Sequence, residues 1–132
     1  MRASVAAGIV YAVVVFLVGF CVGAVRVLLV APHVGEVSAV ALEAPIMLAV
    51  SWIVAARSVQ ALRVPPSVLP RVVMGGVALV VLLLGEWAVA AAVFARSTAQ
   101  FLGAYRTTAG GIGLLTQLAF AGLPLAQRPA ST

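Results

Sequence analysis

The stretch from Gly19 to Arg57 decides the fold, and it reads GFCVGAVRVLLVAPHVGEVSAVALEAPIMLAVSWIVAAR. Two long apolar runs meet here at a Pro-His segment and carry Arg26, Glu36 and Glu43. Each run is long enough for a helix across a bilayer, which takes about 20 mainly apolar residues. A charge inside such a run is costly and needs a partner, water or a proton. We therefore interpret the stretch as a transmembrane hairpin with charged side chains inside it.

The composition supports a membrane protein. Hydrophobic residues make up 64% of the 132-residue chain and charged residues only 8%, whereas soluble domains average roughly 45 to 50% and 25%. The first apolar run is too long for the core of a secretory signal, and further apolar runs follow it. We therefore expect the first run to be retained as a helix of the mature protein.

Four apolar runs predict four spanning helices, at about residues 4–31, 34–56, 72–95 and 108–126. Pro32 is expected to end the first helix, because proline opposes helix continuation. The segment 57–71 is rich in Pro and Arg and is expected to form a short, stiff loop. No other segment is long enough for a core of its own. We expect one all-α domain over residues 1–132, a bundle of four transmembrane helices.

The arginines predict the orientation, because short cytoplasmic loops carry the excess of basic residues. With four spans, five arginines share the side of both termini and three fall on the other side. The five are Arg2, Arg57, Arg63, Arg71 and Arg128. We therefore expect both termini in the cytoplasm, with Arg57, Arg63 and Arg71 near anionic lipid headgroups. The Lys-free, Ala-, Val- and Arg-rich composition suggests a bacterial inner (plasma) membrane.

Several function classes are disfavoured by the residues present. The basic residues are spread singly among apolar runs, which argues against nucleic-acid binding despite a net charge of +5. Cys21 is the only cysteine and His33 the only histidine, so no disulfide within the chain or cysteine-based metal motif is possible. No nucleophile, zinc or phosphate-binding motif occurs. We expect no catalytic residue, metal or cofactor.

Six charged side chains fall in or beside the same ends of the expected helices. They are Arg26, Glu36, Glu43, Glu86, Arg96 and Arg106. Glu86 lies about ten residues, or roughly 15 Å of helix, before Arg96 and cannot easily reach the interface. Thr116 and Gln117 on the last helix are candidate hydrogen-bonding partners. We therefore predict one buried charge network near the outer face of the bundle.

The second expected helix has the sharpest pattern. Glu36 and Glu43 are seven residues apart, and Met47 continues the same helical face, which we expect to point into the protein. Pro45 lies two residues after Glu43 and frees the carbonyl of Ala41. A helix loosened beside an acid resembles the discontinuous helices that line transport sites. The alternative is an ordinary proline kink beside a satisfied carboxylate.

Gly19 and Gly23 share one face of the first helix with Arg26, since steps of four and three residues return to the same side. Glycines at this spacing allow close approach of a second helix backbone. We therefore predict a helix-packing face here, whose partner lies either in the same chain or in a second copy.

These patterns support three hypotheses. The leading one is a non-enzymatic membrane protein, a self-associating or accessory subunit of a homo-oligomer or larger complex, held by its Glu/Arg network. The second is a small proton- or cation-coupled transporter that uses Glu43 and Glu86. The third, a lipid-interacting enzyme at the outer interface, would depend on Glu36 or His33. A solvent-reachable cavity around the charges favours transport, whereas closed ion pairs favour an architectural role.

Overall fold

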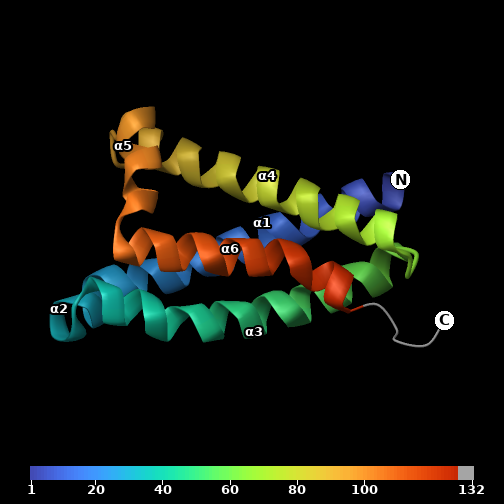
Figure 1. Ribbon diagram of the computed structural model, residues 1–132, viewed down its shortest axis with the longest axis horizontal. Coiled ribbons are helices and arrows are strands. Elements are labelled where there is room, and N and C mark those ends of the chain that lie inside the picture. The colour runs from blue at the N-terminus through green and yellow to red at the C-terminus, as the bar shows by residue number, and fades with distance from the viewer. Residues whose placement is uncertain (128–132) are drawn as a thin grey trace.

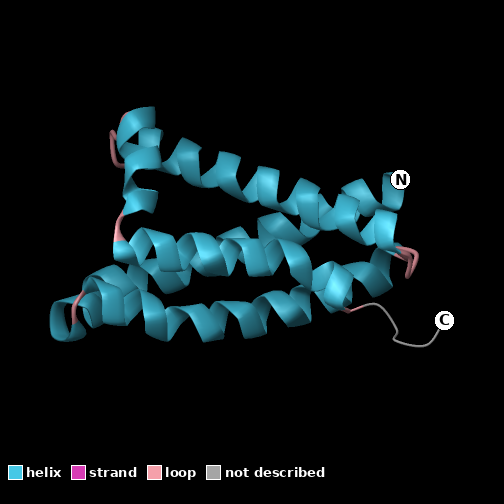
Figure 2. Cartoon of the chain, viewed as in Figure 1, coloured by secondary structure: helices cyan, strands magenta, loops and turns pink. Residues whose placement is uncertain are grey.

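A computed structural model describes residues 1–127, and its regular structure in that range is entirely helical (Figure 2). The four long helices are α1 (Arg2–Val25), α3 (Glu36–Leu62), α4 (Val68–Ala92) and α6 (Thr108–Ala126). Shorter elements are π-helical η1 (Arg26–Val30), α2 (Ala31–Val34), α5 (Thr98–Gly103) and the 3-10 helix η2 (Ala104–Arg106). Four helical stretches are long and apolar enough to cross a membrane, which confirms the prediction of four such helices. Arg128, used above to predict the orientation, lies outside the described residues.

The four long helices form two hairpins, α1 with α3 and α4 with α6, that pack side by side (Figure 1). Around the bundle the order is α1, α4, α6, α3, so that α1 faces α6, and α3 faces α4, only across a diagonal. The start of α1, the loop 63–67 and the end of α6 lie together at what we call the terminal end. The opposite end, which carries α2 and α5, is called the α5 end.

The first helix does not end at Pro32, contrary to the prediction. It continues through η1 and α2 to Val34, and Gly35, with a φ of 86°, turns the chain into α3. The N–H of Ala31 bonds to the carbonyl of Arg26, five residues back, which widens the turn before the proline. A widened turn of this kind absorbs the missing proline N–H without stopping the helix. The turn that Gly35 makes is one that glycine adopts at little cost.

The loop between the hairpins is also shorter than predicted. α3 continues to Leu62 and α4 begins at Val68, so that residues 63–67, rather than 57–71, connect them. Pro70 lies in the first turn of α4, where backbone N–H groups have no partner within the helix and proline is tolerated. The predicted bounds failed because α3 continues past the end of the apolar run at Arg57, and because Pro70 was taken to exclude helix before residue 72.

Close backbone contact holds the terminal end together. A methyl group added at Gly8 would lie 2.7 Å from the carbonyl oxygen of Met74, and one added at Gly75 would overlap the carbonyl of Ala121. Small residues allow membrane helices to approach this closely. At this end, the contacts between long helices that demand glycine are therefore α1 with α4 at Gly8, and α4 with α6 at Gly75.

A hydrogen bond crosses the diagonal of the bundle at the same end. The hydroxyl of Tyr11, fully buried in α1, donates to the carbonyl of Phe120 in α6 at 2.7 Å. Their rings are stacked, with centroids 4.2 Å apart. Pro124, four residues after Phe120, lacks the N–H that would otherwise bond to this carbonyl. The proline thus frees an acceptor that the tyrosine satisfies.

Arg71 is buried, although the sequence suggested a place near lipid headgroups. Its side chain is 4% exposed, and its guanidinium donates to the carbonyls of Pro124 at 2.8 Å and Pro65 at 3.2 Å. These acceptors lie at the end of α6 and in the 63–67 loop, so that Arg71 ties the two segments together. Arg57 and Arg63 are exposed, and their contact with anionic lipid stays a prediction.

Candidate functional site

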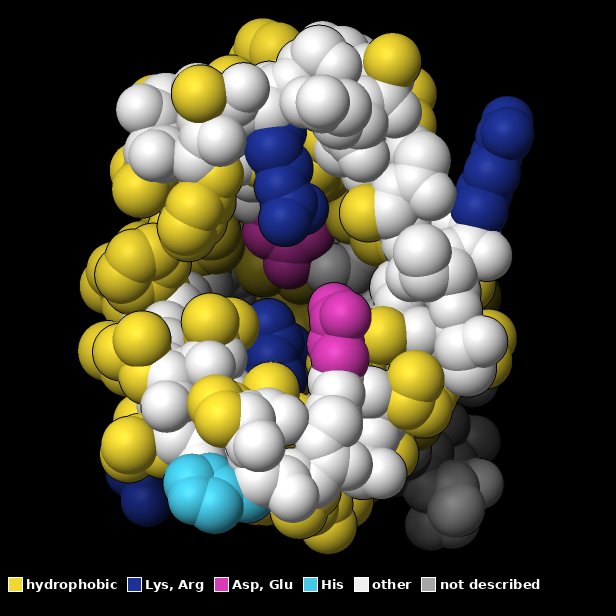
Figure 3. Space-filling view, turned by 90° about the vertical axis from the view of Figure 1, so that its left-hand side faces the viewer, with side chains coloured by type: hydrophobic (Ala, Val, Ile, Leu, Met, Phe, Trp, Pro, Cys, Tyr) yellow, Lys and Arg dark blue, Asp and Glu magenta, His cyan; other side chains and the backbone are white. Residues whose placement is uncertain are grey.

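The α5 end of the bundle is hollow. A cavity of about 660 Å³ lies among the four long helices, and Figure 3 shows the hollow from this end, with arginine and glutamate side chains around and inside it. Most of its wall is apolar. The charged and polar lining residues are Arg26, Glu43, Ser51, Glu86, Arg96, Thr116 and Gln117. Cavities of roughly 300 to 1,000 Å³ with apolar walls and a few polar groups are typical of small-molecule sites.

Small residues and diverging helices leave this space open. α4 rises away from the hairpin of α1 and α3 toward the α5 end (Figure 1). Gly19 and Gly23, expected to pack against a helix backbone, line the cavity instead. A methyl group added at Gly19 would meet the Cε of Met47 at 3.4 Å, and one at Gly23 would meet the guanidinium of Arg26 at 3.8 Å. Within the described chain, these glycines therefore provide room rather than a close helix contact.

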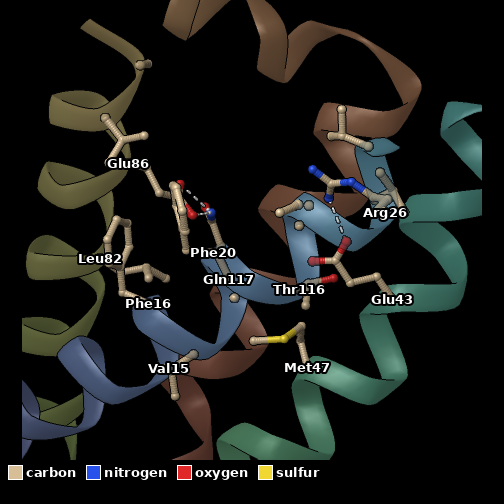
Figure 4. A pocket seen from close by; sticks show the side chains of 18 of the residues that line it. Val15, Phe16, Phe20, Arg26, Glu43, Met47, Leu82, Glu86, Thr116 and Gln117 are labelled. Atoms are coloured by element: carbon tan, nitrogen blue, oxygen red, sulfur yellow. Dashed lines mark hydrogen bonds and ion pairs between the residues drawn. The ribbon is translucent and has the colours of Figure 1, made fainter. Parts of the chain in front are cut away.

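On one wall, Arg26 and Glu43 form an ion pair (Figure 4). Nη1 of Arg26, the first residue of η1, lies 2.7 Å from Oε2 of Glu43 in α3. The two side chains are 30% and 15% exposed, respectively, so the pair is partly shielded from solvent. It is the one ion pair found in residues 1–127. Glu43 therefore has its charge balanced within the first hairpin.

On the opposite wall, Glu86 is held by two uncharged side chains. Nε2 of Gln117 donates to both carboxylate oxygens at 2.7 Å, and the hydroxyl of Tyr105 donates to Oε2 at 3.2 Å. Figure 4 shows Glu86 and Gln117 facing the space between the helices. Oε1 of Gln117 is buried without a hydrogen-bond partner in the described part of the chain. This wall therefore offers a carboxylate without an arginine partner and an unused amide acceptor.

Tyr105 was not predicted as a site residue from the sequence, although it completes the Glu86 site. Burial, together with the neighbouring Glu86 carboxylate, raises the pKa of Tyr105 to about 12. Its hydroxyl thus keeps its proton at neutral pH and remains a donor. The signal in the sequence was the spacing of Phe101 and Tyr105, four residues apart in a short linker, which indicates one apolar helical face. Their rings pack edge to face at 5.5 Å.

The remaining predicted network residues separate into two groups. Arg96 lines the cavity, directly after Ala95, which has a φ of 53°. Glu36 and Arg106 are exposed at the same end and do not line the cavity. Thr116 lines it, but its hydroxyl donates to the carbonyl of Ile112 in its own helix at 2.9 Å. The six charges therefore form one ion pair, one amide-held carboxylate and three separate side chains.

Two other sequence features have modest structural roles. α3 continues as one α-helix through Pro45, and the irregular backbone beside the cavity is instead the π-helical turn that begins at Arg26. A ring nitrogen of His33, Nδ1, lies 2.7 Å from the carbonyl oxygen of Leu29 in the preceding turn. No group of three potential metal ligands of the His, Cys, Asp or Glu type occurs within residues 1–127.

Comparison with known proteins identifies no relative: no family model, curated protein or solved structure matches this chain. Any functional argument therefore depends on the cavity itself.

Proposed function

We propose that the protein is a non-enzymatic membrane transporter that binds a small cationic solute in the cavity at the α5 end, with Glu86 as the counter-charge. One observation carries the proposal: the Glu86 carboxylate lines an open cavity and no cationic side chain lies within ion-pairing distance of it in the described chain. A carboxylate at membrane depth is costly without a balancing charge or proton. A bound cation supplies that balance.

Glu86 is a better candidate for this role than Glu43. Arg26 already neutralises Glu43 at 2.7 Å, so a cationic solute would have to displace a guanidinium to bind there. The partners of Glu86 are neutral donors, Gln117 and Tyr105, which orient the carboxylate and leave it without an ion-pair partner in the described chain. The unused Oε1 of Gln117 is a further acceptor for a solute with several N–H groups. Both features favour a guanidinium or ammonium group.

We further propose that the protein resides in a bacterial plasma membrane with both termini in the cytoplasm. This orientation is supported by Arg2, Arg57 and Arg63, which lie at the terminal end. The cavity then opens toward the outside of the cell. Reporter fusions to the C-terminus and to the α5 segment provide the test, and a cytoplasmic signal from the α5 fusion would contradict this orientation.

The binding test uses butylguanidinium, which carries a permanent charge and N–H donors. We expect purified protein in detergent to bind it by calorimetry, and proteoliposomes to take it up. Glu86→Gln keeps the size and most hydrogen bonds of the side chain but removes the charge, and binding should weaken at least about tenfold. Glu36→Gln is the matched control, because Glu36 is exposed outside the cavity.

Three results would contradict the proposal: no binding by the wild type, equal affinity in the wild type and Glu86→Gln, or equal loss in Glu36→Gln. Uptake distinguishes a transporter from a protein that only binds. Because a poorly folded variant would also lose binding, the thermal unfolding of Glu86→Gln must match that of the wild type for its binding result to count.

A second candidate function is that of a self-associating or accessory subunit. It is favoured by Glu36 and Arg106, which are exposed at the α5 end and have no ion-pair partner within the described residues. A neighbouring subunit can pair with both. Crosslinking in the membrane and mass measurement in detergent test this function. A strict monomer that co-purifies with nothing would argue against it.

A further inference from the structure

The charges that line the cavity are balanced in sign, but only two of them pair with each other. Four charged side chains line it: Arg26, Glu43, Glu86 and Arg96. The first two form the ion pair described above. What remains is one carboxylate, Glu86, and one guanidinium, Arg96, neither of which makes an ion pair in the described chain. The cavity therefore presents one free charge of each sign.

The backbone before Arg96 is unusual. Ala95 adopts the left-handed conformation, with a φ of 53°, three residues after the end of α4. The N–H of Arg96 then bonds to the carbonyl of Ala90 at 2.9 Å, which turns the chain back over the end of the helix. A residue with a Cβ adopts this conformation only at an energetic cost. The fold thus maintains a strained turn that brings Arg96 to the cavity.

Apart from its charged and polar groups, the wall of the cavity is apolar and includes several aromatic rings. Five phenylalanines line the cavity: Phe16, Phe20, Phe94, Phe101 and Phe120. Aromatic faces attract cations and pack well against apolar groups. A ligand that fills this space therefore needs an apolar body as well as its charged groups.

We propose that the cavity takes an amphoteric amphiphile, a solute with a cationic group for Glu86, an apolar middle section and an anionic group for Arg96. This inference rests on the proposed function, since it names the class of the cationic solute that Glu86 binds. A solute of this class leaves no net charge in the filled cavity. A simple cation would satisfy Glu86 but bring a second positive charge into the cavity that Arg96 lines, where like charges repel.

The test compares matched probes on the purified protein in detergent. Alkylguanidinium ions supply the cation and apolar chain, the corresponding ω-guanidino carboxylates add an anionic end, and alkanoates lack the cation. The chain is lengthened stepwise, because the anionic end has to reach Arg96. At one or more chain lengths, we expect the wild type to bind the guanidino carboxylate at least about tenfold more tightly than the alkylguanidinium. A gain of this size is expected from one charge-assisted hydrogen bond.

Two variants test whether Arg96 is responsible for the preference for the guanidino carboxylate. Arg96→Gln should remove the preference for the added carboxylate and leave alkylguanidinium binding unchanged or slightly stronger. Arg106→Gln is the matched control, because Arg106 is exposed at the same end but does not line the cavity, and it should keep the full preference.

The inference fails if the carboxylate gives no gain at any chain length, or if the gain persists in Arg96→Gln. Either result leaves the proposed function standing, provided that alkylguanidinium ions bind in a manner that depends on Glu86. If no probe binds in that manner, the proposed function and this inference fail together.

Discussion

The two ends of the bundle are built from the same four helices but differ in the contacts between those helices. At the terminal end, backbones touch at Gly8 and Gly75, and carbonyl oxygens accept bonds from Tyr11 and Arg71. At the α5 end, the helices separate around a cavity of about 660 Å³ with charged side chains on its walls. The first end is held by close backbone contacts between long helices and by bonds to the backbone. At the second end, the long helices are linked by side-chain contacts such as Arg26 to Glu43 and Gln117 to Glu86. Close backbone contact at that end occurs in the turn between Ala104 and Gly110.

The difference indicates that the two ends have different roles, one in stability and the other in binding. Backbone contacts between membrane helices leave little freedom, because a shift of either helix breaks many of them at once. Side chains such as Arg26 and Gln117 can change partners while their helices stay in place. We therefore expect the terminal end to fix the bundle, and the α5 end to leave room for the solute that we propose. Three substitutions test this difference, in order of decreasing effect on stability.

The largest effect is expected from Gly75→Leu. The added side chain would overlap the carbonyl of Ala121 and force α4 away from α6, and overpacking of this severity costs about 3 kcal/mol. Gly76→Leu is the control in the adjacent position, because a methyl group there meets no atom within 4 Å. Unfolding in detergent measures the stability of both variants. Equal stability of the two variants would show that the terminal end is not closely packed.

An intermediate effect is expected from Tyr11→Phe. The change keeps the stacked ring but leaves the Phe120 carbonyl, already freed by Pro124, without a donor, at a cost of about 1 to 2 kcal/mol. In a Pro124→Ala background, the restored N–H can bond to that carbonyl, and the same substitution should cost less. The free energy of unfolding is measured for all four combinations. A loss independent of the background would contradict this account of the proline.

The smallest effect is expected from Glu43→Gln at the α5 end. The change breaks the pair with Arg26, but both side chains keep some contact with solvent, so we expect a loss of only about 1 kcal/mol. A double-mutant cycle with Arg26→Gln isolates the coupling between the two side chains. A coupling energy larger than the Tyr11→Phe effect would reverse the comparison between the two ends.

The sequence predicts the four long helices well, because a run of about 20 apolar residues has few alternatives to a spanning helix. It also indicates that Glu86 needs a partner, and Gln117, one of two candidate hydrogen-bonding residues for the predicted network, lies 2.7 Å away. These features depend on local composition and on how deep a residue lies. The sequence gives direct information on both the local composition and the position of a residue along its helix.

Features that depend on the order of helices around the bundle could not be predicted. The bond from Tyr11 to Phe120 requires α1 and α6 to face each other across the diagonal, which no hydropathy pattern reveals. Arg71 was placed at the lipid interface because the rule for arginines considers loops and not the carbonyls of neighbouring helices. Pro32 was taken as a helix end because the widened turn before it leaves no mark in composition.

The division into two hairpins also has a consequence for biosynthesis. Arg26 is paired with Glu43 inside the first hairpin, and Glu86 is held by Gln117 and Tyr105 inside the second. Each half therefore contains the side-chain partners of the carboxylate that it contributes to the cavity. Domains and hairpins that emerge first from the ribosome begin to fold first. In the membrane location that we propose, the N-terminal half can enter the bilayer with Arg26 and Glu43 already paired, before the C-terminal half has been translated.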